Sequence, residues 1–251
     1  MPERKVKKRK YEYLVFDADH TLLNYLADER AAFSRLYEEL GMERTEALLQ
    51  ESRLSSEETW TAAGLYDVHD PAVQRRYHAV YRSHVEDIFK RIFARFPCPK
   101  TDVTPLVAGQ KFLKNLETGG NLIKGAEKTL AALSHKTGGA HKICIATNGL
   151  SDIQRGRIKP LERYIDGTYI SEEVGSIKPL PAYFERIFKG ENTRAENCLM
   201  IGDSLSSDIA GARAVGMDCC WFNPARAENN TPFAPDYEIS DLYELVSLLK
   251  K

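Results

Sequence analysis

The chain has 251 residues, of which 43% are hydrophobic and 28% are charged, and its formal net charge at pH 7 is −1. This length and composition suit one large globular domain, or a core that carries a smaller inserted domain. The near-zero net charge excludes a global field that would recruit nucleic acid or an anionic membrane. No apolar stretch approaches the ~18 residues that a membrane span needs. We therefore expect neither a nucleic-acid partner nor a membrane partner.

Basic residues crowd the start of the chain, where residues 4–10 contain a single apolar side chain. The longer apolar region that a secretory signal requires does not follow, so we interpret residues 1–10 as a solvated basic tail and not as a secretory signal. The five cysteines lack the spacing of a metal site. Four of them lie in apolar runs: Cys144, Cys198, Cys219 and Cys220. Buried thiols are typical of a reducing compartment, which predicts a cytoplasmic protein.

The first structural element is a short apolar block at residues 14–16, which predicts a buried strand. Apolar residues then recur at helical spacing, and no strand pattern interrupts them. Four helices are predicted in this stretch, beginning near Asp28, Ala47, Asp70 and Val103. We therefore expect residues 24–117 to form an all-helical insert.

The pattern changes after residue 118, where short apolar strands alternate with helices. Strands are predicted at residues 143–146, 168–170, 198–201 and 219–222. Helices are predicted at residues 126–133, 153–161, 182–188 and 209–215, with a last helix from residue 241. Such alternation predicts an α/β core, made of residues 1–23 and 118–251, with a mostly parallel sheet covered on both faces.

Two aspartates follow the first strand directly. Asp17 and Asp19 are two residues apart, so on an extended backbone both carboxylates face the same side. Like charges held together at a strand end are costly unless a cation or a shared proton offsets their repulsion. A pair of this kind often serves only as a turn or helix cap, but it is also the pattern of a magnesium site.

The other strand ends also carry polar side chains, and in a parallel sheet these ends meet at one edge where ligands bind. The residues concerned are Thr147, Asn148 and Gly149 after one strand, Asp203 and Asp208 after another, and Lys178 in a loop before a helix. Taken singly, each suits a turn, a helix start or a surface lysine. Together, the carboxylates suit a hard cation, while the hydroxyl, the ammonium group and the turn amides suit a phosphate.

These residues form four motifs that resemble those of the haloacid dehalogenase superfamily, in the same order and at plausible separations. The motifs are Asp17-x-Asp19-x-Thr21, Thr147-Asn148-Gly149, Lys178-Pro179 and Gly202-Asp203-Ser204-x-x-x-Asp208. The resemblance implies a Rossmann-like three-layer core with a helical cap domain inserted after the first strand. It also implies Mg²⁺ as the cofactor and a small phosphorylated metabolite as the substrate.

A narrower resemblance is to the house-cleaning pyrimidine 5′-nucleotidases of that superfamily. It rests on residues 16–23, on residues 171–175 with Lys178-Pro179, and on residues 202–209 and 221–224. No residue of the helical insert can be matched, and specificity in the superfamily resides largely there. His20 lies where the subfamily varies, and we assign it no catalytic role.

The resemblance implies a role for each motif residue. Asp17 is the nucleophile and Asp19 is the general acid and base. Lys178 also has a catalytic role. The metal ligands are Asp17, the backbone carbonyl of Asp19 and Asp203, with Asp208 in a secondary role, and the phosphate-binding residues are Thr147, Asn148, Gly149 and Lys178. Hydrolytic dehalogenases of this fold lack an aspartate at the position of Asp19, because halide leaves without a proton, so its presence here favours a phosphatase.

Several alternatives stay open at this stage. The substrate expected from the subfamily is a nucleoside 5′-monophosphate with a pyrimidine base, and another small metabolite such as a sugar phosphate is the alternative. A further alternative is a protein without catalytic activity that uses this fold only to bind a partner. Aromatic residues of the insert, including Trp60, Tyr77 and Tyr81, suit either base stacking or a packed core. The sequence does not fix the oligomeric state.

Overall fold

The computed structural model describes residues 10–250; residues 1–9, which include most of the predicted basic tail, and residue 251 lie outside the described part. The chain divides into two compact units. The sheet unit comprises Met1–Leu23, Leu122–Asn148 and Pro160–Lys251, and the helical unit comprises Asn24–Asn121 and Gly149–Lys159. The insert boundaries expected from the sequence stay a prediction. Among the helices of residues 10–250, none combines the length and the apolar character that crossing a bilayer demands.

A parallel β-sheet forms the centre of the sheet unit. Its strand order is β3-β2-β1-β4-β5-β6, and every neighbouring pair is parallel. The strands are β1 (Tyr13–Phe16), β2 (Lys142–Thr147), β3 (Gly167–Ile170), β4 (Cys198–Gly202), β5 (Asp218–Phe222) and β6 (Tyr237–Ile239). This is the order of a Rossmann fold, in which the direction of chain progression reverses between β1 and β4. The predicted α/β class with a mostly parallel sheet is therefore confirmed.

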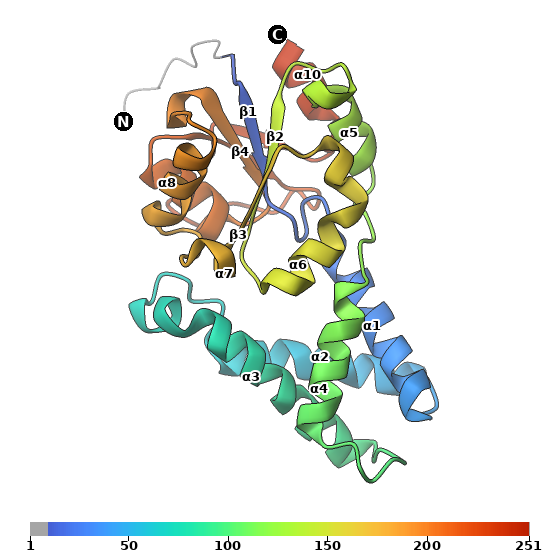
Figure 1. Cartoon of the computed structure of the whole chain (residues 1–251). Helices are drawn as coiled ribbons and strands as arrows, with labels where there is room; N and C mark the ends of the chain where they lie inside the picture. Colours follow the sequence, from blue (N-terminus) through green and yellow to red (C-terminus); the bar gives the residue numbers. More distant parts are fainter. Residues whose placement is uncertain (1–9, 251) are drawn as a thin grey trace. The chain divides into compact units, whose positions relative to one another are not determined.

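The central strand β1 is buried on both faces. Val15 packs in a core cluster with Tyr183, Phe184 and Ile187 of helix α8 (Pro181–Gly190). Because side chains alternate along a strand, Leu14 and Phe16 point to the opposite face, and both are fully buried. Figure 1 shows α5 (Ala126–Leu133) and α10 (Glu244–Lys250) on the other side of the sheet from α8. The sheet unit therefore has three layers.

Shorter elements complete the sheet unit. They are α7 (Ser171–Val174), a π-helical turn η4 (Leu205–Ile209), α9 (Ala210–Ala214) and the 3₁₀ turns η1 (His135–Thr137), η2 (Lys159–Tyr164, which starts on the last residue of the helical unit) and η3 (Ala195–Asn197). The apolar pattern did not predict β6, because this edge strand has three residues and only Ile239 among them is buried. The last helix, expected from residue 241, begins at Glu244.

All four helices predicted between residues 24 and 117 are present in the helical unit. They are α1 (Tyr25–Leu40), α2 (Glu46–Ala62), α3 (Pro71–Arg95) and α4 (Pro105–Glu117), and α6 (Ser151–Ile158) belongs to the same unit. The side chains of Thr45, Asp70 and Thr104 cap α2, α3 and α4 by accepting a backbone N–H of the first turn. Gly41 ends α1 at a φ of 72°, a left-handed conformation that favours glycine.

By residue type, the polar side chains of α3, which include Arg75 and His84, are expected to form a solvated face, and His84 differs from this expectation. His84 is buried, and its Nδ1 lies 2.6 Å from the Tyr81 carbonyl oxygen. Its ring packs edge-on against Trp60, with the ring centroids 5.1 Å apart. Tyr77 and Tyr81 are buried in the same aromatic cluster, so they belong to the core of the helical unit. His84 lies three residues after Tyr81 and four before Ile88, so helical spacing places it within the apolar stripe, and only its polar residue type favoured a solvated position.

A fully buried ion pair joins the segments of the helical unit. Arg157 of α6 donates from Nε to Asp28 Oδ2 of α1 at 2.9 Å, and both side chains have no exposed surface. Asp28 Oδ1 accepts the backbone N–H groups of Gly120 and Asn121, each at 2.9 Å. One carboxylate therefore holds together α1, α6 and the segment that follows α4.

We predict that Arg157→Met destabilises the protein by about 3–5 kcal/mol, because the mutation leaves the Asp28 charge buried without its partner. The measurement is the urea unfolding midpoint of the full chain. The matched control is Arg75→Met on the exposed side of α3, for which we expect a change of about 0.5 kcal/mol or less. Equal effects of the two substitutions would contradict the assignment.

Candidate active site

Two carboxylates lie at the carboxyl ends of the two strands that meet at the reversal of strand order. Asp17 follows β1, and its backbone N–H donates to the Ile201 carbonyl at 2.8 Å, which extends the pairing with β4 by one residue. Asp203 follows directly after β4. Ligands of open α/β sheets bind at this point, so the topology itself places both acids where chemistry is expected.

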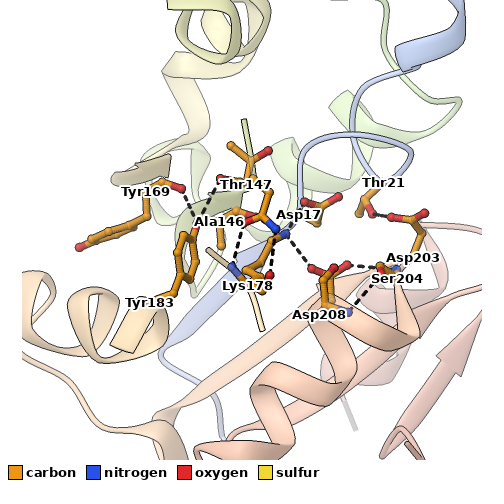
Figure 2. Close-up of polar contacts among 12 residues, drawn as sticks. Asp17, Thr21, Ala146, Thr147, Tyr169, Lys178, Tyr183, Asp203, Ser204 and Asp208 are labelled. Atoms are coloured by element: carbon orange, nitrogen blue, oxygen red, sulfur yellow. Dashed lines mark hydrogen bonds and ion pairs between the residues drawn. The ribbon is translucent and has the colours of Figure 1, made fainter. Parts of the chain in front are cut away.

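Lys178, in the loop between α7 and α8, lies among these acids with only 2% of its surface exposed. Its Nζ donates to Asp17 Oδ1 at 2.5 Å, to Asp208 Oδ1 at 2.7 Å and to the Ala146 carbonyl at 2.7 Å (Figure 2). The three acceptors come from the ends of β1 and β2 and from η4. The ammonium group thus has a charged or polar partner for each of its protons.

Asp208 is the most enclosed acid of the site and has no exposed surface. Its Oδ2 accepts the Ser204 backbone N–H at 3.1 Å, while its Oδ1 is taken by Lys178. A Cβ on Gly202 would lie 2.2 Å from Asp208 Oδ2, so the last residue of β4 has to be glycine for the carboxylate to fit. This explains in steric terms why glycine precedes Asp203.

Asp203 has fewer protein partners than Asp208. Its Oδ1 accepts the Thr21 hydroxyl at 3.3 Å, and its backbone carbonyl accepts Trp221 Nε1–H at 2.9 Å. Trp221 lies on β5, two positions from β1 in the sheet, and the sequence motifs gave it no role. Such a contact to a backbone oxygen leaves no signature in residue type, which is why motif reading missed it.

The three aspartates could hold a divalent cation. Asp17, Asp203 and Asp208 each offer one carboxylate oxygen, and these atoms lie within 4.8 Å of one another. Within residues 10–250, Lys178 donates to Oδ1 of Asp17 and no protein donor reaches its Oδ2, while the Asp203 carboxylate accepts the Thr21 hydroxyl and a backbone N–H. Carboxylate oxygens are the ligands that Mg²⁺ takes, so the donor set fits this ion. Both oxygens of Asp208 are engaged, which suits a supporting role.

Negative charge exceeds positive charge in this site. Burial raises the pKa of Asp17 well above its usual value, and Asp208 and Asp203 add to the effect while Lys178 opposes it. Burial and the nearby Asp208 charge raise the pKa of Asp203 to about 7. Burial alone would lower the pKa of Lys178, but Asp17 and Asp208 outweigh it and the net shift is upward. A bound divalent cation would supply the missing positive charge.

The remaining motif residues follow the ends of β1 and β2 in the chain. Thr147 is the last residue of β2 and is buried, Asn148 follows it, and Gly149 is the first residue of the next segment, which belongs to the helical unit. Asp19 is partly exposed, in a loop closed by the backbone N–H groups of Leu22 and Leu23, which both donate to the Ala18 carbonyl. The roles of these residues toward a phosphate stay predictions.

Tyr183 is a further residue that the motifs did not indicate. It is buried on α8, and its hydroxyl donates to the Tyr169 carbonyl at 2.5 Å, with the Thr147 carbonyl at 3.5 Å (Figure 2). Burial raises the pKa of this hydroxyl. Tyr183 therefore stays protonated and ties the ends of β2 and β3 together beneath the site.

Comparisons with known proteins agree with this arrangement. A family model described as haloacid dehalogenase-like hydrolase matches residues 11–216. The chain is 30% identical to pyrimidine 5′-nucleotidase PynA of Streptococcus pneumoniae over 96% of each protein. It is 28% identical to pyrimidine 5′-nucleotidase YjjG of Escherichia coli, over 96% of this chain and 99% of that protein. The crystal structure of the putative HAD-hydrolase YfnB from Bacillus subtilis bound to magnesium is similar with a TM-score of 0.78 and 28% identity, covering 97% of this chain and 100% of that one.

The raised pKa values predict that protons compete with a divalent cation. Between the usual aspartate pKa of 3.8 and about 7, the metal-free folded state keeps a proton on Asp203 that the unfolded chain releases, so the contribution of this group to stability falls as pH rises. A cation binds the deprotonated form, so Mg²⁺ affinity should be about tenfold lower at pH 6 than at pH 8.

Isothermal titration with Mg²⁺ at the two pH values measures this difference, and the rise in melting temperature on adding Mg²⁺ should likewise be larger at pH 8. Asp203→Asn serves as the comparison variant, since it removes the titrating group, and it should flatten the pH dependence. An affinity that does not change with pH in the original chain would speak against a metal site at these aspartates.

Proposed function

The chain belongs to the haloacid dehalogenase-like hydrolase family, and on this premise we propose that it is a Mg²⁺-dependent phosphomonoesterase that forms an aspartyl-phosphate on Asp17. The observation that supports this most is the gathering of three aspartates at the reversal point of the sheet: Asp17 and Asp208 are buried and bind Lys178, and Asp203 lies beside them, partly exposed. Phosphoryl transfer is mainly a matter of positioning and charge stabilisation, and this arrangement offers both.

Asp17 is the nucleophile in this proposal. Lys178 donates to Asp17 Oδ1 and so fixes the orientation of the carboxylate that attacks phosphorus. Asp17, Asp203 and the backbone carbonyl of Asp19 hold the metal, with Asp208 in support. A bound Mg²⁺ supplies the positive charge that lets an anionic phosphate approach a carboxylate.

Two further groups stabilise the phosphoryl group as its charge spreads over the oxygens. Lys178 contributes a permanent positive charge, since the surrounding carboxylates keep its pKa raised. Thr147 contributes a hydroxyl at the end of β2, next to the Ala146 carbonyl that the same lysine contacts. The turn at Asn148 and Gly149 completes the phosphate-binding segment.

Asp19 is the general acid and base. It protonates the leaving alkoxide and then activates the water that hydrolyses the aspartyl-phosphate. Its position two residues after Asp17 brings it to the same loop, and its partly exposed side chain agrees with an exchange of protons with solvent. An alkoxide requires this proton and a halide does not, so Asp19 supports an ester hydrolase over a dehalogenase.

The proposed substrates are nucleoside 5′-monophosphates with pyrimidine bases. Support comes from PynA and YjjG, which carry the name pyrimidine 5′-nucleotidase and align with 96% of this chain. A hydrolysis screen tests this with pyrimidine and purine nucleoside monophosphates and sugar phosphates, each with Mg²⁺ and with excess chelator. We expect release of phosphate from uridine or thymidine monophosphate, lost on chelation and restored by Mg²⁺.

The screen also separates the alternatives. If the enzyme prefers a sugar phosphate, the proposed phosphatase mechanism stands and the proposed nucleotide substrate is wrong. Phosphate binding with no turnover of any ester would instead indicate a non-catalytic binding protein and would contradict the proposal.

Exchanging the acid/base should slow the reaction without unfolding the protein. Asp19→Asn should lower kcat by about 10²- to 10⁴-fold, the usual contribution of a general acid or base. Asp87→Asn, an exposed aspartate of α3 in a surface ion pair with Lys90, is the matched control and should leave kcat unchanged. Undiminished phosphate release by Asp19→Asn would show that the acid/base assignment is wrong.

A further inference from the structure

The side chain of Asn148 binds the backbone of Lys178 with both ends of its amide. Asn148 Oδ1 accepts the Lys178 backbone N–H at 2.8 Å, and Asn148 Nδ2 donates to the Lys178 carbonyl at 3.0 Å. The pair acts like one rung of a sheet between two segments that are 30 residues apart in sequence. A side chain that binds both the backbone N–H and the backbone carbonyl of another residue fixes the position of that residue's backbone.

The same segment also fixes the other end of Lys178. The Ala146 carbonyl accepts the Nζ–H of Lys178 at 2.7 Å, and Ala146 stands two residues before Asn148 at the end of β2. The carboxyl end of β2 thus contacts both the backbone and the ammonium group of the lysine. These contacts set how far the ammonium group reaches toward Asp17, which it meets at 2.5 Å.

We propose that Asn148 is a positioning residue, which acts on the reaction through Lys178 and not by binding phosphate with its side chain. This inference rests on the proposed phosphatase function; it assigns the Asn148 side chain to Lys178 and leaves phosphate binding at this turn to the backbone amides. The amide places the lysine backbone, and the lysine places its charge between Asp17 and Asp208. Loss of the amide lets the ammonium group move, and a misplacement of about 1 Å in a catalytic group costs on the order of 100-fold in rate.

The chain contains a second asparagine with the same bonding pattern, which serves as a matched control. Asn223 Oδ1 accepts the Ala227 backbone N–H at 2.9 Å, and its Nδ2 donates to the Ala227 carbonyl at 2.9 Å. This amide closes a loop after β5 and contacts no lysine. Truncating Asn148 or Asn223 removes two hydrogen bonds to the backbone of one other residue, and Asn223→Ala also removes the bond from Nδ2 to Glu238 Oε1 at 2.7 Å. The control therefore loses at least as many hydrogen bonds as Asn148→Ala, and none of them involves Lys178.

The kinetic test compares Asn148→Ala with Asn223→Ala. We expect Asn148→Ala to lower kcat about 100-fold. KM and the inhibition constant of inorganic phosphate should change less than about threefold, because no group that binds phosphate is removed. Asn223→Ala should lower the melting temperature and leave kcat unchanged. A tenfold rise of KM and of the phosphate inhibition constant with kcat retained would show that the Asn148 side chain binds phosphate, and would overturn the proposal.

A double-mutant cycle tests whether Asn148 acts through the lysine. In the Lys178→Ala background, Asn148→Ala should cause less than about a threefold further loss, since the residue it positions is already absent. If the two losses multiply, the asparagine acts on the reaction by another route and the proposal fails.

An activity-independent measurement keeps this proposal separate from the proposed function. The modification rate of Lys178 by an amine-specific reagent, followed by mass spectrometry, should rise at least about tenfold in Asn148→Ala, because two hydrogen bonds that hold its backbone are lost. Lys114, whose side chain is 74% exposed, is the internal reference, and Asn223→Ala should leave the Lys178 rate unchanged. If the unaltered enzyme hydrolyses no phosphate ester, the proposed function fails, and the modification rate alone then tests whether Asn148 positions Lys178. An unchanged modification rate of Lys178 in Asn148→Ala would overturn the proposal that Asn148 positions it.

Discussion

The buried contact between the Lys178 ammonium group and the carboxylates of Asp17 and Asp208 is the interaction on which the rest of the site depends. Asp17, Asp208 and Lys178 are buried at one edge of a sheet with the partly exposed Asp203 beside them, so negative charge is in excess there. Burying unpaired charge is expensive, so such an arrangement needs further compensation. A divalent cation meets that need and also prepares the site for an anionic substrate. The charges of these aspartates and of Lys178 therefore affect both the stability of the sheet unit and the reaction proposed for it.

The fold brings these charges together through backbone geometry. The strand order places the ends of β1 and β4 side by side, so Asp17 and Asp203 become neighbours although 186 positions separate them in the chain (203 − 17). Gly202 gives Asp208 the room to reach the same place, and β2 contributes the carbonyl and the amide that hold Lys178. The helical unit is organised separately, around the buried pair of Asp28 and Arg157.

Much of this architecture could be predicted from the sequence, because its signals lie in residue type and spacing. The apolar runs located β1 to β5, and Asp70 marked the start of α3. The carboxylates stood out because they follow apolar strands. Backbone atoms carry no such signal, so the Ala146 carbonyl and the two bonds of the Asn148 amide appeared only in the structure. The short edge strand β6 was missed because tertiary packing determines it, and the burial of His84 was missed because its polar residue type was given more weight than its place in the apolar stripe of α3.

The central claim is that Asp17 becomes phosphorylated during turnover. The most direct measurement is to mix enzyme, Mg²⁺ and a hydrolysable nucleoside monophosphate, quench with acid in the steady state and map phosphorylated peptides by mass spectrometry. The account predicts a phosphoryl group on Asp17 that disappears when the substrate is exhausted and never forms in Asp17→Asn, which should also be inactive. Sustained hydrolysis with no phosphorylated Asp17, or an active Asp17→Asn, would contradict it.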